Sequence, residues 1–221
     1  MKYKYWLIIL IVIIAVLVGY FIFQTKPAEY AEMTDGPHVK GNPEASLVLI
    51  EFSDFQCPAC GYAFATLTSQ LDQYFDKLKF EYRHFPLESI HPYAFRAAEA
   101  SECAADQGKF WEYHDLLFQN QKSLTKKDLA LYAARIDGLD VELWQDCLDS
   151  GLKAARVQAD LNEASGMGLN STPTFILGGQ IVQDWTQLPQ MIESLVNPLV
   201  PLQNNSTSTQ LNLINDSLFA S

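Results

Sequence analysis

Two cysteines three positions apart are the residues best suited to chemistry in this chain. Cys57 and Cys60 are separated by Pro58 and Ala59. At the start of a helix, the first sulfur of such a motif lies among unpaired backbone N–H groups, which together with the helix dipole favour its thiolate. The second cysteine, one turn later, is placed to attack a mixed disulfide and release the partner. The spacing therefore predicts thiol–disulfide exchange.

Two other uses of this motif must be weighed. A zinc site would require two more ligands, usually a second closely spaced pair, and the remaining cysteines, Cys103 and Cys147, are isolated. A purely structural disulfide between Cys57 and Cys60 would close too short a loop to stabilise the fold much. Redox chemistry is the leading interpretation, and we predict no metal and no organic cofactor.

The elements around the motif indicate a βαβ unit. Residues 46–52 form an almost continuous apolar run, which is typical of a strand buried on both faces. Pro58 stands where a proline is tolerated best, in the first turn of a helix, and apolar residues recur at helical spacing over 62–75. Residues 78–85 predict a second strand. The motif then lies where the first strand passes into the helix.

Residues 88–168 change character and predict an inserted helical subdomain. The expected helices are 92–107, 110–119, one capped by Thr125 and Asp128, one capped by Asp140, and 153–164. The sheet then resumes with a hairpin of strands 174–177 and 180–182 around Gly178-Gly179, followed by a helix over 185–195. The pattern predicts an α/β fold interrupted by helices.

Cys103 and Cys147 fall on two different helices of the predicted insertion. Free buried cysteines are common. In an oxidising compartment, however, two such residues are expected to pair. We therefore predict a structural disulfide between Cys103 and Cys147.

Residues 6–23 are apolar apart from Gly19 and Tyr20, close to the length that crosses a bilayer as a helix. Basic residues in segment 1–5 predict that the N-terminus is cytoplasmic. A cleaved signal peptide is the alternative, but Glu29 occupies a position where a cleavage site requires a small residue. We predict a single-pass signal anchor in the cell membrane with the domain on the extracytoplasmic side.

The remaining segments complete the expected organisation. We expect residues 24–43 to form a linker and residues 44–197 to form the folded domain. The polar residues 198–221 are expected to be a disordered tail. The net charge is −11 and the soluble part has no basic cluster. Nucleic acid is therefore not an expected partner, because its phosphates require clustered Lys and Arg.

Four segments carry a resemblance to a known family. Residues 52–60, Phe-Ser-Asp-Phe-Gln-Cys-Pro-Ala-Cys, resemble the active-site segment of the DsbA-like branch of the thioredoxin superfamily. Residues 84–87, 110–114 and 171–175 resemble the end of its second strand, part of its inserted helices and its cis-proline loop. Together the matches span about residues 45–195. The resemblance implies a thioredoxin-like fold with a helical insertion.

The resemblance also implies roles for three more residues. A cis bond between Thr172 and Pro173 would present the Thr172 backbone to an extended substrate strand; otherwise Pro173 is a trans proline that opens an edge strand. Glu51 lies six residues before Cys57, where thioredoxin-like enzymes keep a buried acid. It would carry protons to and from Cys60, unless it is a strand-end residue that reaches solvent.

The function implied is oxidation of reduced, exported proteins by a monomer that a membrane quinone-linked partner reoxidises. Ala59 replaces a histidine of the best-known members, and this departure predicts a less acidic Cys57 and an oxidase of moderate strength. A reductase or isomerase is the alternative within the class. A redox-inert binding module anchored at the membrane is the alternative outside it.

Overall fold

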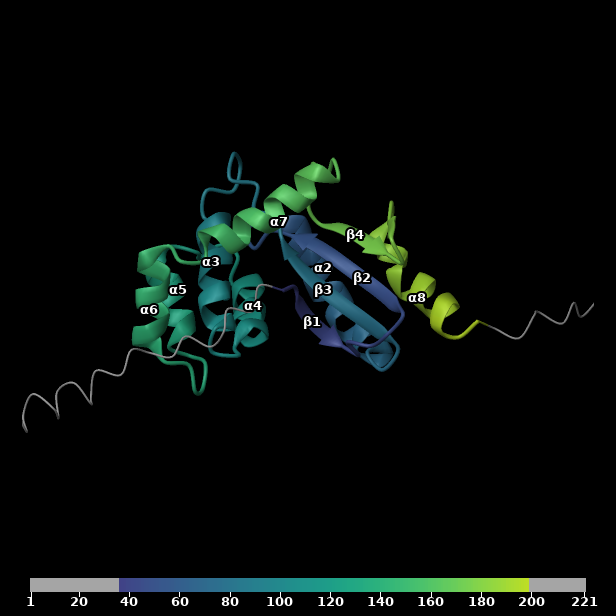
Figure 1. Cartoon of the computed structure of the whole chain (residues 1–221), viewed down its shortest axis with the longest axis horizontal. Helices are drawn as coiled ribbons and strands as arrows, with labels where there is room; N and C mark the ends of the chain where they lie inside the picture. Colours follow the sequence, from purple (N-terminus) through teal and green to yellow (C-terminus); the bar gives the residue numbers. More distant parts are fainter. Residues whose placement is uncertain (1–35, 199–221) are drawn as a thin grey trace, which may run out of the picture.

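A five-stranded mixed sheet forms the centre of the protein (Figure 1). The computed structural model describes residues 36–198. The strand order is β1-β3-β2-β4-β5, and β2 and β3 are parallel whereas the other neighbours are antiparallel. The strands are β1 (His38–Gly41), β2 (Leu47–Ser53), β3 (Leu78–His84), β4 (Thr174–Leu177) and β5 (Gln180–Ile181). The parallel pair is the expected βαβ unit, since parallel neighbours need a crossover connection.

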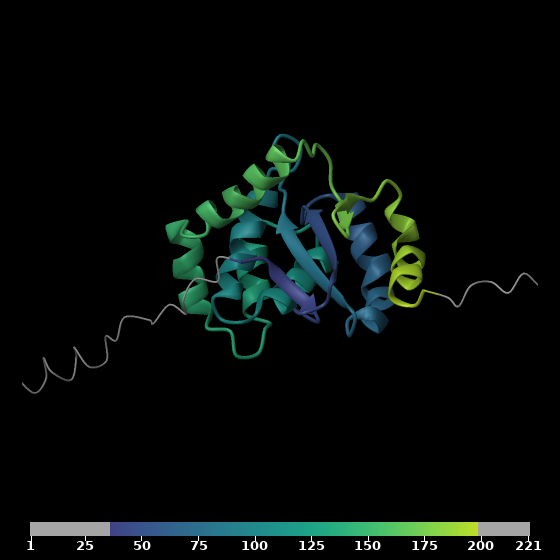
Figure 2. The same cartoon turned by 45° about the vertical axis from the view of Figure 1, so that its right-hand side comes forward.

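Helices lie on both faces of the sheet. They are α2 (Pro58–Leu71), α3 (Ala94–Ala105), α4 (Phe110–Gln119), α5 (Lys126–Ala133), α6 (Val141–Ser150), α7 (Ala154–Gly166) and α8 (Leu188–Val196), with 3-10 turns η1 (Asp72–Tyr74) and η2 (Trp185–Gln187). Figure 2 shows α2 and α8 side by side, and their Leu67 and Ile192 share one apolar cluster with Leu49 of β2. Helix α7 packs on the opposite face, where Ala164 contacts the cluster around Phe52. The sheet is therefore covered from both sides.

The predicted helical insertion is confirmed. Helices α3 to α7 all lie between β3 and β4, within the range expected at about 88–168. Thr125 and Asp128 form a capping box at the start of α5, and the Asp140 side chain accepts hydrogen bonds from the first turn of α6. Local capping chemistry thus placed these two helix starts correctly.

One apolar cluster joins the insertion to the cysteine motif. Phe55 and Cys60 belong to the same buried cluster as Leu117 of α4 and Trp144 of α6. Tyr82 of β3 also belongs to it and is fully buried. The insertion is therefore part of the core that holds the motif. Because buried side chains are closely packed, a shift of the insertion helices would also shift the residues around Cys60.

The prediction that residues 24–43 form a linker is wrong at its end. Residues His38–Gly41 form strand β1, which pairs antiparallel with β3, so the folded domain begins before residue 44. The strand has only four residues of mixed polarity and one pairing neighbour, which leaves no periodic signal in the sequence. Its attachment depends on His38, whose ring is buried against Glu102, 64 residues later.

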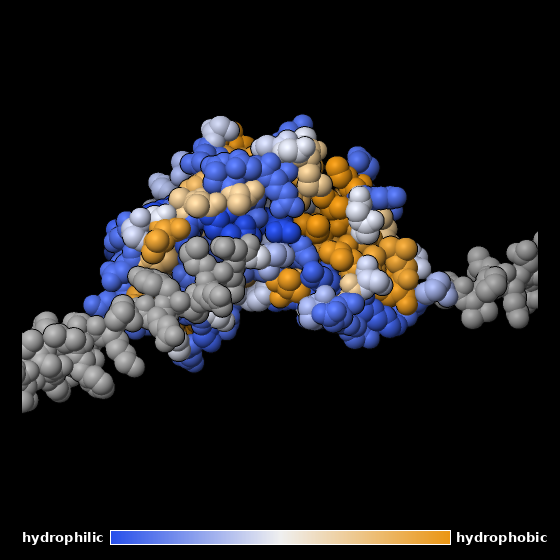
Figure 3. Space-filling view, in the orientation of Figure 1, coloured by the Kyte–Doolittle hydropathy of each residue, from blue (hydrophilic) through white to orange (hydrophobic). Residues whose placement is uncertain are grey.

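The molecular surface differs between the sheet and the insertion. In Figure 3, hydrophobic residues gather over β2, β4 and α8, whereas hydrophilic residues predominate over the helices on the other side of the view. Within residues 36–198, no helix has the length and apolar character needed to cross a bilayer. The predicted cytoplasmic segment 1–5, the anchor 6–23 and almost all of the tail 198–221 lie outside the described residues.

Candidate active site

Cys57 is the residue that precedes helix α2, with an extended backbone and Pro58 as the first helical residue. Its backbone N–H donates to the carbonyl oxygen of Asp54 at 3.1 Å and to the Asp54 carboxylate at 3.2 Å. Its side chain contacts a distant loop, because the thiol donates to the carbonyl oxygen of Thr172 at 3.4 Å. Residues 172 and 173 are joined by a cis peptide bond. The structure therefore brings Cys57 and the Thr172-Pro173 loop together.

The two sulfurs of the motif have opposite acid–base properties. A hydrogen bond from the Cys60 thiol holds the pKa of Cys57 well below its ordinary value, against the opposing effect of burial; the Thr172 side chain and the backbone N–H groups of Cys60 and Ala59 lower it further. Burial raises the pKa of Cys60, and the neighbouring Cys57 raises it again. Both cysteines are free thiols. The two shifts favour the thiolate at Cys57 and the thiol at Cys60, so the hydrogen bond from Cys57 to the Thr172 carbonyl belongs to the protonated form of Cys57.

Glu51 lies on β2, opposite Tyr82 of β3 and Phe175 of β4. Glu51 is 8% exposed. Burial raises the pKa of its carboxyl to about 7, and the Ser53 hydroxyl opposes this rise. Glu51 and Cys60 both lie close enough to Tyr82 for their charges to raise the pKa of its hydroxyl beyond the effect of burial. The acid is therefore buried, as it was expected to be, and it shares its surroundings with the inner sulfur.

A cavity connects Glu51 with polar side chains nearer the surface. Its walls include Lys40 of β1, Asp72 and Asp115, together with apolar residues of α2. Buried hydroxyls near Glu51, those of Ser53 and Tyr82, have no hydrogen-bond partner among the described residues. Such groups are satisfied most readily by water. Glu51 therefore lines a cavity that also carries charged side chains, and two unpartnered hydroxyls lie near it.

Asp54 is a site residue that the sequence interpretation missed. Its carboxylate is fully buried and meets four groups: the N–H groups of Gln56 and Cys57 on Oδ1, and the N–H of Leu87 and the His91 ring on Oδ2. The contact to Nδ1 of His91 is 2.7 Å. An Asp three residues before an N-cap is a recognisable turn signal, but the partners of Asp54 beyond residue 57 are not local.

Cys103 on α3 and Cys147 on α6 are joined by a disulfide with their Cα atoms 5.8 Å apart. Both residues are buried, 1% and 3% exposed. The bond links two helices of the insertion, and its two residues belong to the same buried cluster as Cys60. Chemistry at this pair would need the insertion to open.

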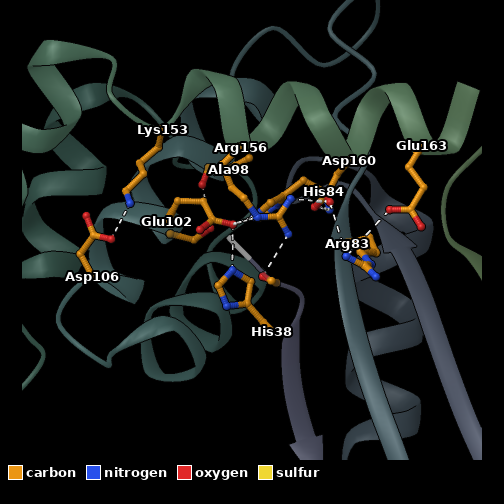
Figure 4. A network of polar contacts seen from close by, with 12 residues as sticks. His38, Arg83, His84, Ala98, Glu102, Asp106, Lys153, Arg156, Asp160 and Glu163 are labelled. Atoms are coloured by element: carbon orange, nitrogen blue, oxygen red, sulfur yellow. Dashed lines mark hydrogen bonds and ion pairs between the residues drawn. The ribbon is translucent and has the colours of Figure 1, made fainter. Parts of the chain in front are cut away.

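One cluster of described residues has the composition of a metal site. His38, His84 and Glu102 bring their ligand atoms within 4.8 Å of one another, and both Nε2 atoms lie within 2.9 Å of the same Glu102 oxygen (Figure 4). The Arg156 guanidinium stands 3.9 Å from that oxygen. Although burial alone would raise the pKa of Glu102, hydrogen bonds from the two histidines hold it far below its ordinary value. The group is a buried hydrogen-bonded network that fixes β1 to the insertion.

Comparisons with known proteins agree with the fold. The family model described as Thioredoxin matches residues 33–196. The structure resembles BdbD from Bacillus subtilis, with a TM-score of 0.66 and 22% identity over 75% of this chain and 95% of that one. It also resembles a thioredoxin-like oxidoreductase from Silicibacter pomeroyi, with a TM-score of 0.64 and 24% identity over 80% and 100% of the two chains. These likenesses show the shared fold.

The curated relatives are much longer proteins. The Na(+)/H(+) antiporter NhaA 3 of Salinispora tropica is 41% identical over 146 residues, which are 66% of this chain and 22% of that protein. The chain thus spans less than a quarter of that relative's length. The match concerns one segment of a larger protein.

Proposed function

The chain belongs to the thioredoxin family, and on that basis we propose that it is a protein thiol–disulfide oxidoreductase that introduces disulfides into exported proteins. The observation that carries the proposal is the asymmetry between Cys57, whose pKa is lowered, and Cys60, whose pKa is raised. A dithiol of this kind exchanges with other disulfides through its outer sulfur and completes the reaction through its inner one.

The proposed cycle begins with the oxidised motif. A substrate thiolate attacks the sulfur of Cys57, the Cys57–Cys60 bond breaks, and Cys60 leaves with its electron pair. Because Cys60 is a strongly basic thiolate, neutral Glu51 would supply the proton it needs. A second substrate thiolate then attacks the substrate sulfur of the mixed disulfide. Cys57 leaves as a stable thiolate. The motif has then gained two electrons and one proton, which Glu51 delivered to Cys60, and the substrate has lost two electrons and two protons to the motif and the solvent.

The direction of the net reaction follows from which form is stabilised. A thiolate held by hydrogen bonds favours the reduced motif, which makes the disulfide more oxidising. Ala59 supplies only its backbone N–H to this stabilisation. We therefore propose an oxidase of moderate strength, with a potential between about −270 mV of thioredoxin and about −120 mV of DsbA.

Substrate would bind along the loop that faces Cys57. The Thr172 carbonyl is already within hydrogen-bond distance of the sulfur, so an extended substrate strand that pairs with this backbone would place its cysteine beside Cys57. Main-chain pairing of this kind does not depend on substrate sequence. It suits reduced proteins of many sequences, with Thr172 and Pro173 as the platform.

We also propose that the chain works as a monomer on the extracytoplasmic side of the cell membrane, anchored by residues 6–23 and reoxidised by a membrane quinone-linked partner. The apolar segment supports the anchor. The disulfide between Cys103 and Cys147 supports an oxidising compartment, since such bonds are rare where thiols are kept reduced.

A stoichiometric oxidation assay tests the activity. The full chain in detergent, oxidised at the motif, is mixed with an equimolar reduced protein that forms one disulfide, and thiols are counted with time. We expect about two substrate thiols lost per chain, and none with Cys57→Ser. Equilibration with glutathione buffers then gives the potential, and a substrate with scrambled disulfides separates net oxidation from isomerisation. A wild-type chain no faster than Cys57→Ser would contradict the proposal.

The second candidate is a redox-inert module attached to a membrane protein. It is favoured by the 41% identity to a segment of proteins named Na(+)/H(+) antiporters. Such a module would bind its partner equally well in both redox states. Equal affinity for partner proteins with the motif reduced, oxidised or replaced, together with no exchange activity, would favour this candidate over the enzyme.

A further inference from the structure

Gln121 lies in the loop between α4 and α5 and reaches back to the cysteine motif. Its side-chain nitrogen donates to the carbonyl oxygen of Phe55 at 3.0 Å and to that of Cys57 at 2.8 Å. These carbonyls flank Gln56, so one amide group of the insertion holds both ends of the turn that presents Cys57. More than sixty residues separate the donor from its acceptors.

Gly61 provides the space that this contact needs. A Cβ added at Gly61 would overlap the side-chain amide of Gln121. Gly61 lies inside helix α2, where glycine is less favourable than alanine because it loses more backbone freedom on folding. The contact with Gln121 accounts for a glycine at a position where helix propensity alone would disfavour it.

The turn before α2 is held from two sides. The Asp54 carboxylate accepts from the N–H groups of Gln56 and Cys57, whereas Gln121 donates to the carbonyls of Phe55 and Cys57. The Cys57 carbonyl also receives the N–H of Gly61 at 3.1 Å, the first hydrogen bond of the helix. Both the donors and the acceptors of this short segment therefore have fixed partners.

We propose that Gln121 is a positioning residue for the nucleophilic sulfur, through which the helical insertion sets the reactivity of Cys57. The inference rests on the proposed function and deepens it. The sulfur is stabilised first by the Cys60 thiol, then by Thr172 and the N–H groups of Cys60 and Ala59, and these contacts depend on the orientation of the Cys57 backbone. Without Gln121, the Cys57 carbonyl oxygen keeps only the N–H of Gly61, and the sulfur shifts relative to the groups that stabilise it.

Two substitutions at position 121 test this in the full-length chain. Gln121→Ala removes the donor, and Gln121→Glu keeps the shape but turns carboxylate oxygens toward two carbonyls. Gln119→Glu is the matched control, because it adds the same charge two residues away on an exposed side chain. The readouts are the pKa of Cys57 from thiolate absorbance at 240 nm, the equilibrium with glutathione, and the melting temperature of the oxidised chain.

We expect the acid dissociation constant of Cys57 to fall about threefold to tenfold in Gln121→Ala and further in Gln121→Glu, with the control unchanged. The oxidising equilibrium with glutathione should weaken by the same factor, and tenfold corresponds to about 30 mV. A lower melting temperature with an unchanged Cys57 pKa would mean that Gln121 serves only the fold, and would overturn the inference.

Gly61 supplies an independent check, because Gly61→Ala displaces the Gln121 amide without removing it. Gly61→Ala should raise the pKa of Cys57 by displacing the Gln121 side chain, whereas the same change in a Gln121→Ala background should add nothing. Additive effects of the two changes would also overturn the inference. If the wild-type chain exchanges disulfides but none of these variants differs from it, Gln121 is wrongly assigned and the enzyme stands. If the wild-type chain does not exchange at all, the proposed function fails first.

Discussion

The thiol of Cys57 donates a hydrogen bond to the carbonyl oxygen of Thr172 although 115 residues separate them. This contact joins the start of α2 to the loop before β4, across the whole inserted helical subdomain. It places a backbone acceptor and a side-chain hydroxyl beside the same sulfur. The Thr172 hydroxyl oxygen is buried and has no hydrogen-bond partner among the described residues.

Removing that hydroxyl should make Cys57 less acidic. Thr172→Val keeps the branched shape but withdraws a group that lowers the pKa of both motif cysteines. A hydrogen bond worth about 0.5–1.5 kcal/mol corresponds to a rise of up to about one pKa unit. Absorbance at 240 nm against pH measures it. Thr174→Val is the control, because the Thr174 hydroxyl donates to Ser171 and not to a sulfur; equal rises in both variants would contradict the assignment.

Glu51→Gln should slow capture of substrate, the step in which Cys60 leaves, more than release of substrate, the step in which Cys57 leaves. If neutral Glu51 supplies the proton to Cys60, its loss should reduce the rate of exchange by about 10²-fold or more, and most strongly below pH 7, where Glu51 is protonated. Stopped-flow mixing with a fluorescent reduced peptide resolves the steps. A rate that is unchanged across pH 5–8 would remove Glu51 from the mechanism.

Glu51→Gln should increase the free energy of unfolding at high pH, although it lowers the rate of exchange. The pKa of Glu51 rises from its ordinary value of 4.5 to about 7 on folding, so the folded state binds the proton more tightly. The stabilisation present below pH 4.5 is lost as the pH rises through 7, which amounts to about 3 kcal/mol at most. We expect Glu51→Gln to be more stable than wild type at pH 8 and similar at pH 4.5. Urea unfolding of the oxidised proteins at both pH values tests the sign.

The disulfide of the insertion should resist reduction and contribute to stability. Because both cysteines are buried, mild reductant should expose only Cys57 and Cys60 to alkylation, which mass spectrometry of the labelled peptides can establish. Replacing Cys103 and Cys147 together by Ala should cost about 4 kcal/mol, since the bond closes a separation of 44 residues in the unfolded chain. Alkylation of positions 103 and 147 in untreated protein would show that the bond is absent.

Asp54→Asn should destabilise the protein by about 2–4 kcal/mol, because an amide NH₂ would face the Leu87 N–H and the His91 ring where a carboxylate oxygen now accepts. Asp184→Asn is a matched control at an exposed cap, where Asn serves almost as well as Asp. Denaturant unfolding compares the two. A cost below about 0.5 kcal/mol at position 54 would mean that the turn does not depend on this carboxylate.

Much of the fold could be predicted because its signals are local. The apolar run of β2, the proline after Cys57 and the capping pair Thr125 and Asp128 each lie within a few residues of the structure they specify. Strand β1 could not be predicted, since His38–Gly41 has neither length nor periodicity and is held by a partner on α3. Local pattern identifies elements, but not the pairings between them.

The residues of the candidate site also fall into those with a local sequence signal and those without one. Cys57, Cys60 and Glu51 could be named from the sequence because their spacing and their unusual setting mark them. Gln121 could not, because a glutamine in a polar loop has no distinctive neighbours, and its acceptors are backbone carbonyls far away in the chain. Residues that position others through main-chain contacts leave no pattern of their own.

The attachment of β1 determines how a pull on the preceding chain would be distributed. The His38 ring contacts Glu102 on α3, and the carbonyl oxygen of Gly36 accepts from the Arg156 guanidinium on α7 at 3.3 Å. Tension transmitted from residues before Gly36 therefore loads two helices of the insertion as well as the ladder between β1 and β3. The first strand is therefore held by three separate sets of contacts, and breaking its pairing with β3 alone would not detach it from the domain.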